Sequence, residues 1–243
     1  MEPLLIAVCA AFGALTGPLL ARPGYRLAVE PGEPWRSACP RGHPLTGPLR
    51  GWAGLARCPG CGAFGPGPVG LALVTAACCA ALAAATGPRP ELAVWVVAAP
   101  VGVLAARVDV AVRRLPDVLT LPLAAWAAAG LGVAALLPGA GGSWTRALLG
   151  GAVLAAGYFV LFLISPNAMG FGDVKLALSL GVALGWYGWD VVVFGCFAGF
   201  LLAAVSALCL VIAGKAGRKT ALPMGPFLVL GALGSLLLGG LAA

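Results

Sequence analysis

Eight long apolar segments follow one another along the chain, separated by shorter stretches that hold most of its charged residues. A helix needs about 20 mainly apolar residues to cross the hydrocarbon core of a membrane, and continuously apolar runs do not suit the alternating strands of a membrane barrel. The pattern therefore predicts an all-α, polytopic membrane protein with about eight transmembrane helices. The expected helices are Leu4–Ala21, Val69–Thr86, Leu92–Arg107, Val118–Leu137, Ala147–Ser165, Val174–Tyr187, Val191–Ala213 and Pro223–Leu241.

The composition agrees with this prediction and excludes a soluble globular protein. Hydrophobic residues make up 61% of the 243 residues and charged residues only 9%, whereas a soluble domain is about one quarter charged. The first apolar segment has no positive charge in front of it, since the chain starts Met1-Glu2-Pro3 and the basic residues follow the segment. It is therefore expected to be a retained helix rather than a cleaved signal peptide.

Basic residues mark one side of the predicted membrane protein. If the eight segments span the membrane in turn, 13 of the 15 Lys and Arg residues fall on the side of the long loop 22–68, and only Arg89 and Arg146 fall on the other. The positive-inside rule then places that loop in the cytosol and both termini outside. The net charge of +7 is thus a topological signal beside anionic lipid, and no nucleic-acid partner is expected. The 13 residues on the cytosolic side are Arg22, Arg26, Arg36, Arg41, Arg50, Arg57, Arg107, Arg113, Arg114, Lys175, Lys215, Arg218 and Lys219.

Three of the eight acidic residues, Asp109, Asp117 and Asp173, map to the cytosolic boundary of the predicted helices. A carboxylate next to hydrocarbon costs a few kcal/mol, so each of the three needs a reason. The other five fall at loops or helix ends and need no special account. Asp117 follows Pro116 directly before an apolar run, which predicts an N-cap for the fourth helix.

Asp173 also precedes a helix, and a capping role there is the simplest structural interpretation. A cap, however, does not require the glycines on both sides of Phe171. Gly170 and Gly172 let the main chain adopt conformations closed to other residues and let another backbone approach closely. This pair of glycines favours a functional role for Asp173.

Asp109 lies at the C-terminal end of the third expected helix, where the helix dipole disfavours a negative charge. Its structural alternative is an exposed salt bridge with Arg113, worth only tenths of a kcal/mol. Asp109 and Asp173 together would have a specific chemical use, because like charges at close range cannot both ionise and one carboxyl keeps its proton. The ionised member takes a proton from water and the protonated member donates to the carbonyl oxygen, which is aspartyl peptidase chemistry. The chain offers no other nucleophile set, since it has one histidine and no Gly-x-Ser-x-Gly segment.

At these residues the sequence resembles the type IV prepilin peptidases, the bacterial membrane aspartyl peptidases marked by Gly-x-Gly-Asp. The resemblance covers residues 101–228 well and the N-terminal third loosely. Three motifs in the expected order carry it, all on the predicted cytosolic side. They are Asp109 followed by Pro116-Asp117-Val118-Leu119-Thr120-Leu121-Pro122, then Gly170-Phe171-Gly172-Asp173-Val174-Lys175, then Leu222-Pro223-Met224-Gly225-Pro226-Phe227-Leu228.

The resemblance implies that Asp109 and Asp173 are the catalytic pair and that Asp117 is a neighbour in the motif, more consistent with a cap. Lys175 would favour the ionised form of Asp173 or bind lipid headgroups, two interpretations that stay open. The segment with Pro223, Gly225 and Pro226 would break regular helix where an unwound substrate binds; its alternative role is an ordinary helix start.

The resemblance also implies the reaction. A short basic leader would be cut from pilin-like precursors at the cytosolic face of the bacterial cytoplasmic membrane, and many members then methylate the new N-terminus with S-adenosylmethionine. The segment Phe12–Pro18 only faintly resembles the family's Gly-Ser-Phe-Leu-Asn, so the sequence supports proteolysis more strongly than methyl transfer. Gly13 and Gly17 form a small-xxx-small pair, which predicts helix packing.

Four residues of the cytosolic loop predict a metal site. Cys58-Pro59-Gly60-Cys61 has the spacing of a zinc-knuckle half-site, and Cys39 with His43 would complete a Cys3His set. A reducing compartment disfavours disulfides. The family commonly has a second Cys-x-x-Cys pair, and here Gly42 takes the place of its second cysteine. Residues 1–68 are therefore expected to form a first helix with a zinc-binding, methyltransferase-associated loop, and residues 69–243 the peptidase core.

Two other function classes compete with a peptidase. In an ion- or proton-coupled transporter, carboxylates serve as ion sites, but such sites usually lie near the bilayer midplane in repeated halves. This chain places its aspartates at one face and shows no evident duplication. A catalytically inactive scaffold of a pilus or secretion assembly is the third class, and the presence of both Asp109 and Asp173 argues against it.

Overall fold

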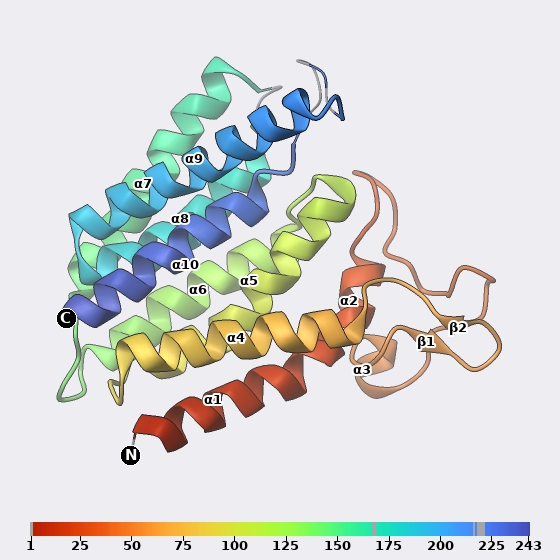
Figure 1. Ribbon diagram of the computed structural model, residues 1–243, viewed down its shortest axis with the longest axis horizontal. Helices are drawn as coiled ribbons and strands as arrows, with labels where there is room; N and C mark the ends of the chain where they lie inside the picture. The colour runs from red at the N-terminus through yellow and green to blue at the C-terminus, as the bar shows by residue number, and fades with distance from the viewer. Residues whose placement is uncertain (1, 167–168, 216, 218–221) are drawn as a thin grey trace.

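The computed structural model describes residues 2–166, 169–215, 217 and 222–243, so Arg218 and Lys219 lie outside the described residues. Within this described part of the chain eight long helices form a bundle, and an irregular loop region lies at one end of it (Figure 1). Both ends of the described chain lie at the opposite end of the bundle. The long helices are α1 (Glu2–Thr16), α4 (Pro68–Thr86), α5 (Leu92–Val112), α6 (Asp117–Ala134), α7 (Trp144–Ile164), α8 (Phe171–Tyr187), α9 (Trp189–Ile212) and α10 (Gly225–Ala242).

The predicted all-α membrane fold is confirmed. Seven helical segments among the described residues are long and apolar enough to cross a membrane. The first of them joins α1 through a 3-10 turn, η1 (Gly17–Leu20), to the short helix α2 (Ala21–Arg26). The remaining long helix is α8, which has 17 residues. Helices α6, α7, α9 and α10 all pack against it.

Glycines allow the closest helix contacts. A Cβ at Gly13 would lie 2.5 Å from the carbonyl oxygen of Thr75, and one at Gly17 would lie 2.6 Å from that of Leu71. Helix α1 therefore packs backbone against backbone on α4, which confirms the packing predicted for the small-xxx-small pair.

The loop region between α2 and α4 holds α3 (Pro48–Gly51) and a hairpin of β1 (Arg57–Cys58) with β2 (Gly62–Ala63). Hydrogen bonds and a cation–π contact of basic side chains connect this loop region to the end of the first span. Arg22 donates hydrogen bonds to the carbonyl oxygens of Thr46 and Leu55, and the Arg26 guanidinium lies 4.0 Å from the ring centroid of Trp52. These contacts hold the middle of the loop region against the end of the bundle.

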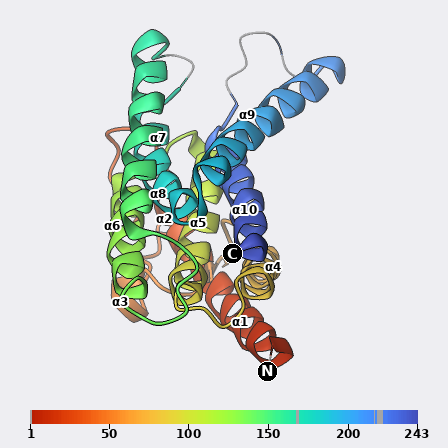
Figure 2. The same cartoon turned by 90° about the vertical axis from the view of Figure 1, so that its left-hand side faces the viewer.

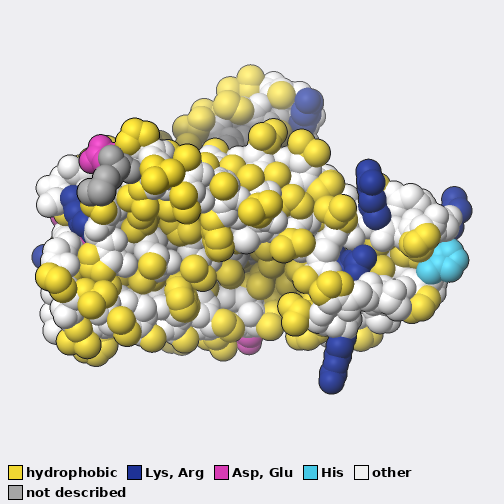
Figure 3. Space-filling model, turned by 90° about the horizontal axis from the view of Figure 1, so that it is seen from below, with side chains coloured by type: hydrophobic (Ala, Val, Ile, Leu, Met, Phe, Trp, Pro, Cys, Tyr) yellow, Lys and Arg dark blue, Asp and Glu magenta, His cyan; other side chains and the backbone are white. Residues whose placement is uncertain are grey.

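Apolar side chains cover much of the face of the bundle that Figure 3 shows, as expected for a surface in contact with lipid. Helix α9 shows this most plainly, because Val193, Phe194, Phe197 and Leu201 are all exposed. In Figure 2, α9 diverges from α7 toward the C-terminal ends of the two helices.

Candidate active site and metal centre

Asp109 lies near the C-terminal end of α5, which continues five residues beyond the predicted end at Arg107. Its side chain is only 4% exposed, so an exposed ion pair does not explain its position. The backbone amide of Gly225 donates a hydrogen bond to its Oδ2 over 2.8 Å. The first and third sequence motifs therefore meet at this carboxylate.

Asp173 lies in the first turn of α8 and is 7% exposed. Its Oδ2 accepts a hydrogen bond of 3.0 Å from the amide of Gly170, while its own amide donates to the carbonyl oxygen of Gly170. The side chain thus closes the start of the helix from the third helical position, where the helix dipole favours a negative charge. The cap proper is Gly170.

Gly172 allows α8 to begin against the segment that leads into α6. A Cβ at this position would lie 2.9 Å from the Cβ of Leu115 and 3.1 Å from its carbonyl oxygen. Leu115 is buried in the same core as Val108 and Val174, the neighbours of the two aspartates in the chain. The glycine before Asp173 therefore serves the close approach expected from the motif.

The structure brings Asp109 and Asp173 to the same end of the bundle, the end that carries the loop region (Figure 1). The two carboxyl groups are close enough to interact electrostatically. Each is buried, and each is oriented by one backbone amide, that of Gly225 or that of Gly170. Two buried carboxyl groups that interact in this way have the chemistry to take a proton from water and to give one to a substrate oxygen.

Asp117 does not act as an N-cap, contrary to the expectation from the sequence. Pro116 holds the N-cap position of α6, with ψ at 140°, and no side chain forms a cap hydrogen bond there. Asp117 is the first residue of the helix and its Oδ1 lies 2.6 Å from Nζ of Lys175. Lys175 also lies over the ring of Phe171, 4.9 Å from its centroid. Lys175 therefore joins the starts of α6 and α8.

Pro223 and Pro226 flank the start of α10. Pro223 lies in the non-helical residues before the helix, and Pro226 occupies its first turn, where a missing amide donor costs nothing. Both fit the ordinary helix start considered from the sequence. Gly225 does more, because a Cβ there would lie 2.9 Å from Oδ2 of Asp109. Only a residue without a side chain lets this amide reach the carboxylate undisturbed.

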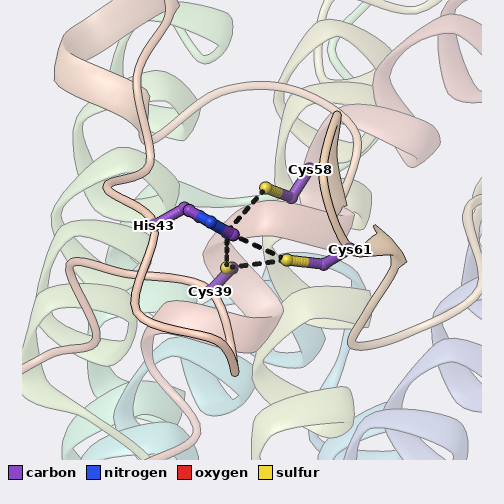
Figure 4. A group of neighbouring side chains, drawn as sticks. All are labelled: Cys39, His43, Cys58 and Cys61. Atoms are coloured by element: carbon purple, nitrogen blue, oxygen red, sulfur yellow. Dashed lines mark hydrogen bonds between the residues drawn. The ribbon is translucent and has the colours of Figure 1, made fainter.

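Cys39, His43, Cys58 and Cys61 form a cluster in the loop region, with Cys58 and Cys61 on the hairpin and the other two on the preceding loop (Figure 4). Nδ1 of His43 lies 3.5, 3.6 and 3.1 Å from the sulfurs of Cys39, Cys58 and Cys61, and all four donor atoms lie within 4.8 Å of one another. Tetrahedral Zn²⁺ with bonds of about 2.3 Å to sulfur and about 2.0 Å to nitrogen separates its ligand atoms by about 3.6 Å. The cluster therefore has the size of a metal site, as expected.

The backbone explains why the side chain of His43, rather than that of residue 42, completes the cluster. Gly42 has φ +84°, a left-handed conformation that strains other residues, and its amide turns back to the carbonyl oxygen of Cys39. A cysteine at position 42 would therefore be strained in this turn. The next residue, His43, supplies the nitrogen.

The cluster also sets the protonation of its thiols. Burial disfavours the Cys39 thiolate, but hydrogen bonds from the Arg41 amide, the Cys61 thiol and His43 outweigh it and lower the pKa of Cys39 to about 6. Burial and the neighbouring thiols of Cys39 and Cys58 raise the pKa of Cys61 to about 11. Such crowding of thiols that cannot all ionise is relieved by a bound cation.

Glu91 is a feature that sequence reasoning missed. It lies at a helix end as expected, but it is completely buried. Its Oε1 accepts hydrogen bonds from the amide of Gly141 and the hydroxyl of Tyr187, while its Oε2 has no partner among the described residues. Glu91 starts α5 at the end opposite Asp109, so it belongs to another part of the fold. Its burial depends on the loop around Gly141, which no local pattern reveals.

The chain matches the model of the type IV leader peptidase family over residues 95–239, a range that includes both aspartates and Gly225 but not the metal cluster. It is 30% identical to a protein of Aeromonas hydrophila named prepilin leader peptidase/N-methyltransferase, over 89% of this chain and 74% of that protein. A protein of Burkholderia pseudomallei with the same name is 33% identical, over 88% of this chain and 69% of its own length. No solved structure gives a significant match.

Proposed function

The chain belongs to the type IV leader peptidase family and is a peptidase, and we propose that Asp109 and Asp173 are its catalytic pair. The substrate proposed is a prepilin-like precursor, from which the enzyme removes the leader peptide. The observation that carries the proposal is the meeting of three distant segments at two buried carboxyl groups.

The reaction needs only water and the two side chains. One carboxylate removes a proton from a water molecule as the oxygen bonds to the scissile carbonyl carbon, and the other carboxyl group gives its proton to the carbonyl oxygen. In the tetrahedral intermediate the bond to the amide nitrogen then breaks, and that nitrogen leaves with a proton from the carboxyl group that received it from water. The hydroxyl proton of the intermediate returns to the other carboxylate, so both groups regain their first states.

The backbone amides of Gly225 and Gly170 have a positioning role in this scheme. Each holds one carboxyl oxygen, at 2.8 Å for Asp109 and 3.0 Å for Asp173. The second oxygen of each group is then left for water or substrate. Fixed orientation of this kind lowers the cost of bringing the reacting groups together.

We place the reaction at the cytosolic face of the bacterial cytoplasmic membrane. The end of the bundle that holds both aspartates also holds α2, with Arg22 and Arg26, and the loop region, with Arg57. Arg89 and Arg146 lie at the other end, beside Gly240 and the end of α8. This distribution supports the proposed placement through the positive-inside rule, and the scissile bond of a membrane-inserted precursor would then lie at headgroup level.

Zn²⁺ is the metal proposed for Cys39, His43, Cys58 and Cys61. The three thiol sulfurs and one imidazole nitrogen form a closed, four-ligand set that suits a structural zinc ion better than a catalytic one. Its proposed role is to hold the hairpin to the preceding loop. The cluster lies outside the family match, so cleavage chemistry is not assigned to it.

Methylation of the new N-terminus is a second candidate activity, suggested by the name of the relatives. S-adenosylmethionine would be the methyl donor.

Both activities are measured in one experiment, the mass spectrometry of a co-expressed precursor's N-terminus. Loss of the leader mass in the presence of the wild-type chain supports the peptidase proposal, and an additional 14 Da, the mass of one methylene group, supports methyl transfer. An intact leader would overturn the proposed substrate class.

A further inference from the structure

We infer that an apolar groove between α4, α5 and α10 is the docking site for the membrane-spanning helix of the precursor. This inference rests on the proposed function, because the occupant is the substrate of that reaction. Its chemical class is an apolar α-helix that enters the groove sideways from the bilayer.

The groove has the length of a helix contact. It encloses about 460 Å³ and is lined by apolar side chains of all three helices, such as Val74, Val103 and Val229. Along α4 the lining extends from Gly67 to Cys78, which corresponds to about 16 Å of helix rise, or three turns. A helix of the precursor can therefore lie along it over several turns.

One end of the groove lies beside the segments that carry Asp109 and Gly225. Val110 lines it directly after Asp109 in the chain, and Pro226 lines it directly after Gly225, whose amide binds Asp109. Arg107 is the charged residue among the described lining residues, and it places this end at the headgroups. A precursor helix in the groove would therefore present the bond before its apolar segment to the carboxyl pair.

The groove is open where a helix would approach. At Gly70 a Cβ would meet nothing within 4 Å, so this position of α4 leaves space that no other part of the described chain fills. Small residues let a second helix come close in a membrane, and Ala106 across the groove is small as well. The groove continues into an apolar cavity of about 100 Å³, with which it shares Cys78, Val103, Val229 and Leu233.

A lipid acyl chain is the competing occupant. Lipid fills any apolar hollow on a membrane protein and needs no fixed relation to Asp109. The groove instead ends at Pro226, directly after the glycine whose amide binds Asp109, and a substrate requires such a fixed relation to a reacting group. The occupant we assign is therefore the precursor helix.

A matched pair of substitutions tests the assignment. Gly70→Leu fills the groove, whereas Gly157→Leu places the same side chain on α7, also exposed and with nothing within 4 Å of its Cβ. In Figure 2, α7 lies on the side of the bundle away from α4 and α10. The probe is a synthetic precursor with a basic leader and a 20-residue apolar helix, reconstituted with the full chain in vesicles. We expect kcat/KM to fall about tenfold or more for Gly70→Leu and to stay within about twofold for Gly157→Leu.

A second measurement uses the unaltered chain, in case Gly70→Leu affects folding. Photoreactive leucine in the apolar helix of the probe should cross-link to residues 67–78 and 226–233. Cross-links confined to other helices, or equal activity of the two variants, would assign the groove to lipid and overturn the inference. Failure of the wild-type chain to cleave the probe at all would instead contradict the proposed function.

Discussion

The amide of Gly225 donates a hydrogen bond to Oδ2 of Asp109 across 116 positions of the sequence. This contact joins the start of α10 to the end of α5. The position tolerates no side chain, because a Cβ there would lie 2.9 Å from the same carboxyl oxygen. The role of the glycine in the third motif can therefore be tested by adding a side chain at this position.

Gly225→Ala should therefore lower leader cleavage by about tenfold to a hundredfold, since displacing a catalytic carboxylate by a fraction of an ångström is costly. Gly234→Ala is the matched control, because it lies in the same helix with nothing within 4 Å of its Cβ. Initial rates of precursor cleavage compare the two variants. Equal rates would show that the Gly225 contact does not position Asp109.

The ion pair of Asp117 with Lys175 should contribute little to activity. The two side chains are 59% and 23% exposed, and such pairs contribute about 1 kcal/mol or less. We expect Asp117→Asn to retain cleavage within about fivefold of wild type, in contrast to Asp173→Asn. Complete loss of cleavage in an Asp117→Asn chain that still inserts would place Asp117 among the reacting groups.

The helical part of the fold was predictable from the sequence, because lipid exposure requires long apolar runs. The ends of the helices were less predictable from the sequence. Arg107 and Asp109 interrupt the apolar pattern, yet α5 continues to Val112 because its backbone hydrogen bonds do not depend on side-chain polarity. It ends where Arg113 adopts a left-handed conformation with φ 51°.

The pairing of Asp109 with Asp173 was an interpretation of motifs, and the role of Asp117 was predicted wrongly. A capping rule considers only neighbours in sequence, whereas Lys175 reaches Asp117 from another helix. The burial of Glu91 was missed for the same reason. The role of Asp117 and the burial of Glu91 both depend on contacts between distant segments. Local sequence patterns do not reveal such contacts.

Helix packing gives a third prediction. A Cβ at Gly181 of α8 would lie 2.5 Å from the carbonyl oxygen of Gly150 in α7, and backbone atoms cannot rotate away. Gly181→Ala should destabilise the fold by about 1–3 kcal/mol through overpacking. Thermal unfolding of the detergent-solubilised protein measures the effect, with Gly157→Ala on the open face of α7 as control. An unchanged midpoint for Gly181→Ala would show that α7 and α8 do not pack so closely.

Zinc content tests the metal cluster. The purified wild-type chain should contain about one Zn²⁺, and Cys58→Ser should lose most of it, because each ligand contributes one of four bonds. Cys209→Ser removes an exposed cysteine of α9 outside the cluster and should leave the zinc content unchanged. Elemental analysis measures all three proteins. Absence of zinc from the wild type, or equal zinc in Cys58→Ser, would contradict the site.

The most direct test of the whole account is the cleavage rate of Asp109→Asn, Asp173→Asn and the double variant, each confirmed to insert in the membrane. Two groups that act as one unit give non-additive losses. Each single variant should therefore fall to background, and the double variant should fall no further. A single variant that keeps a substantial fraction of the wild-type rate would contradict the paired-carboxylate mechanism.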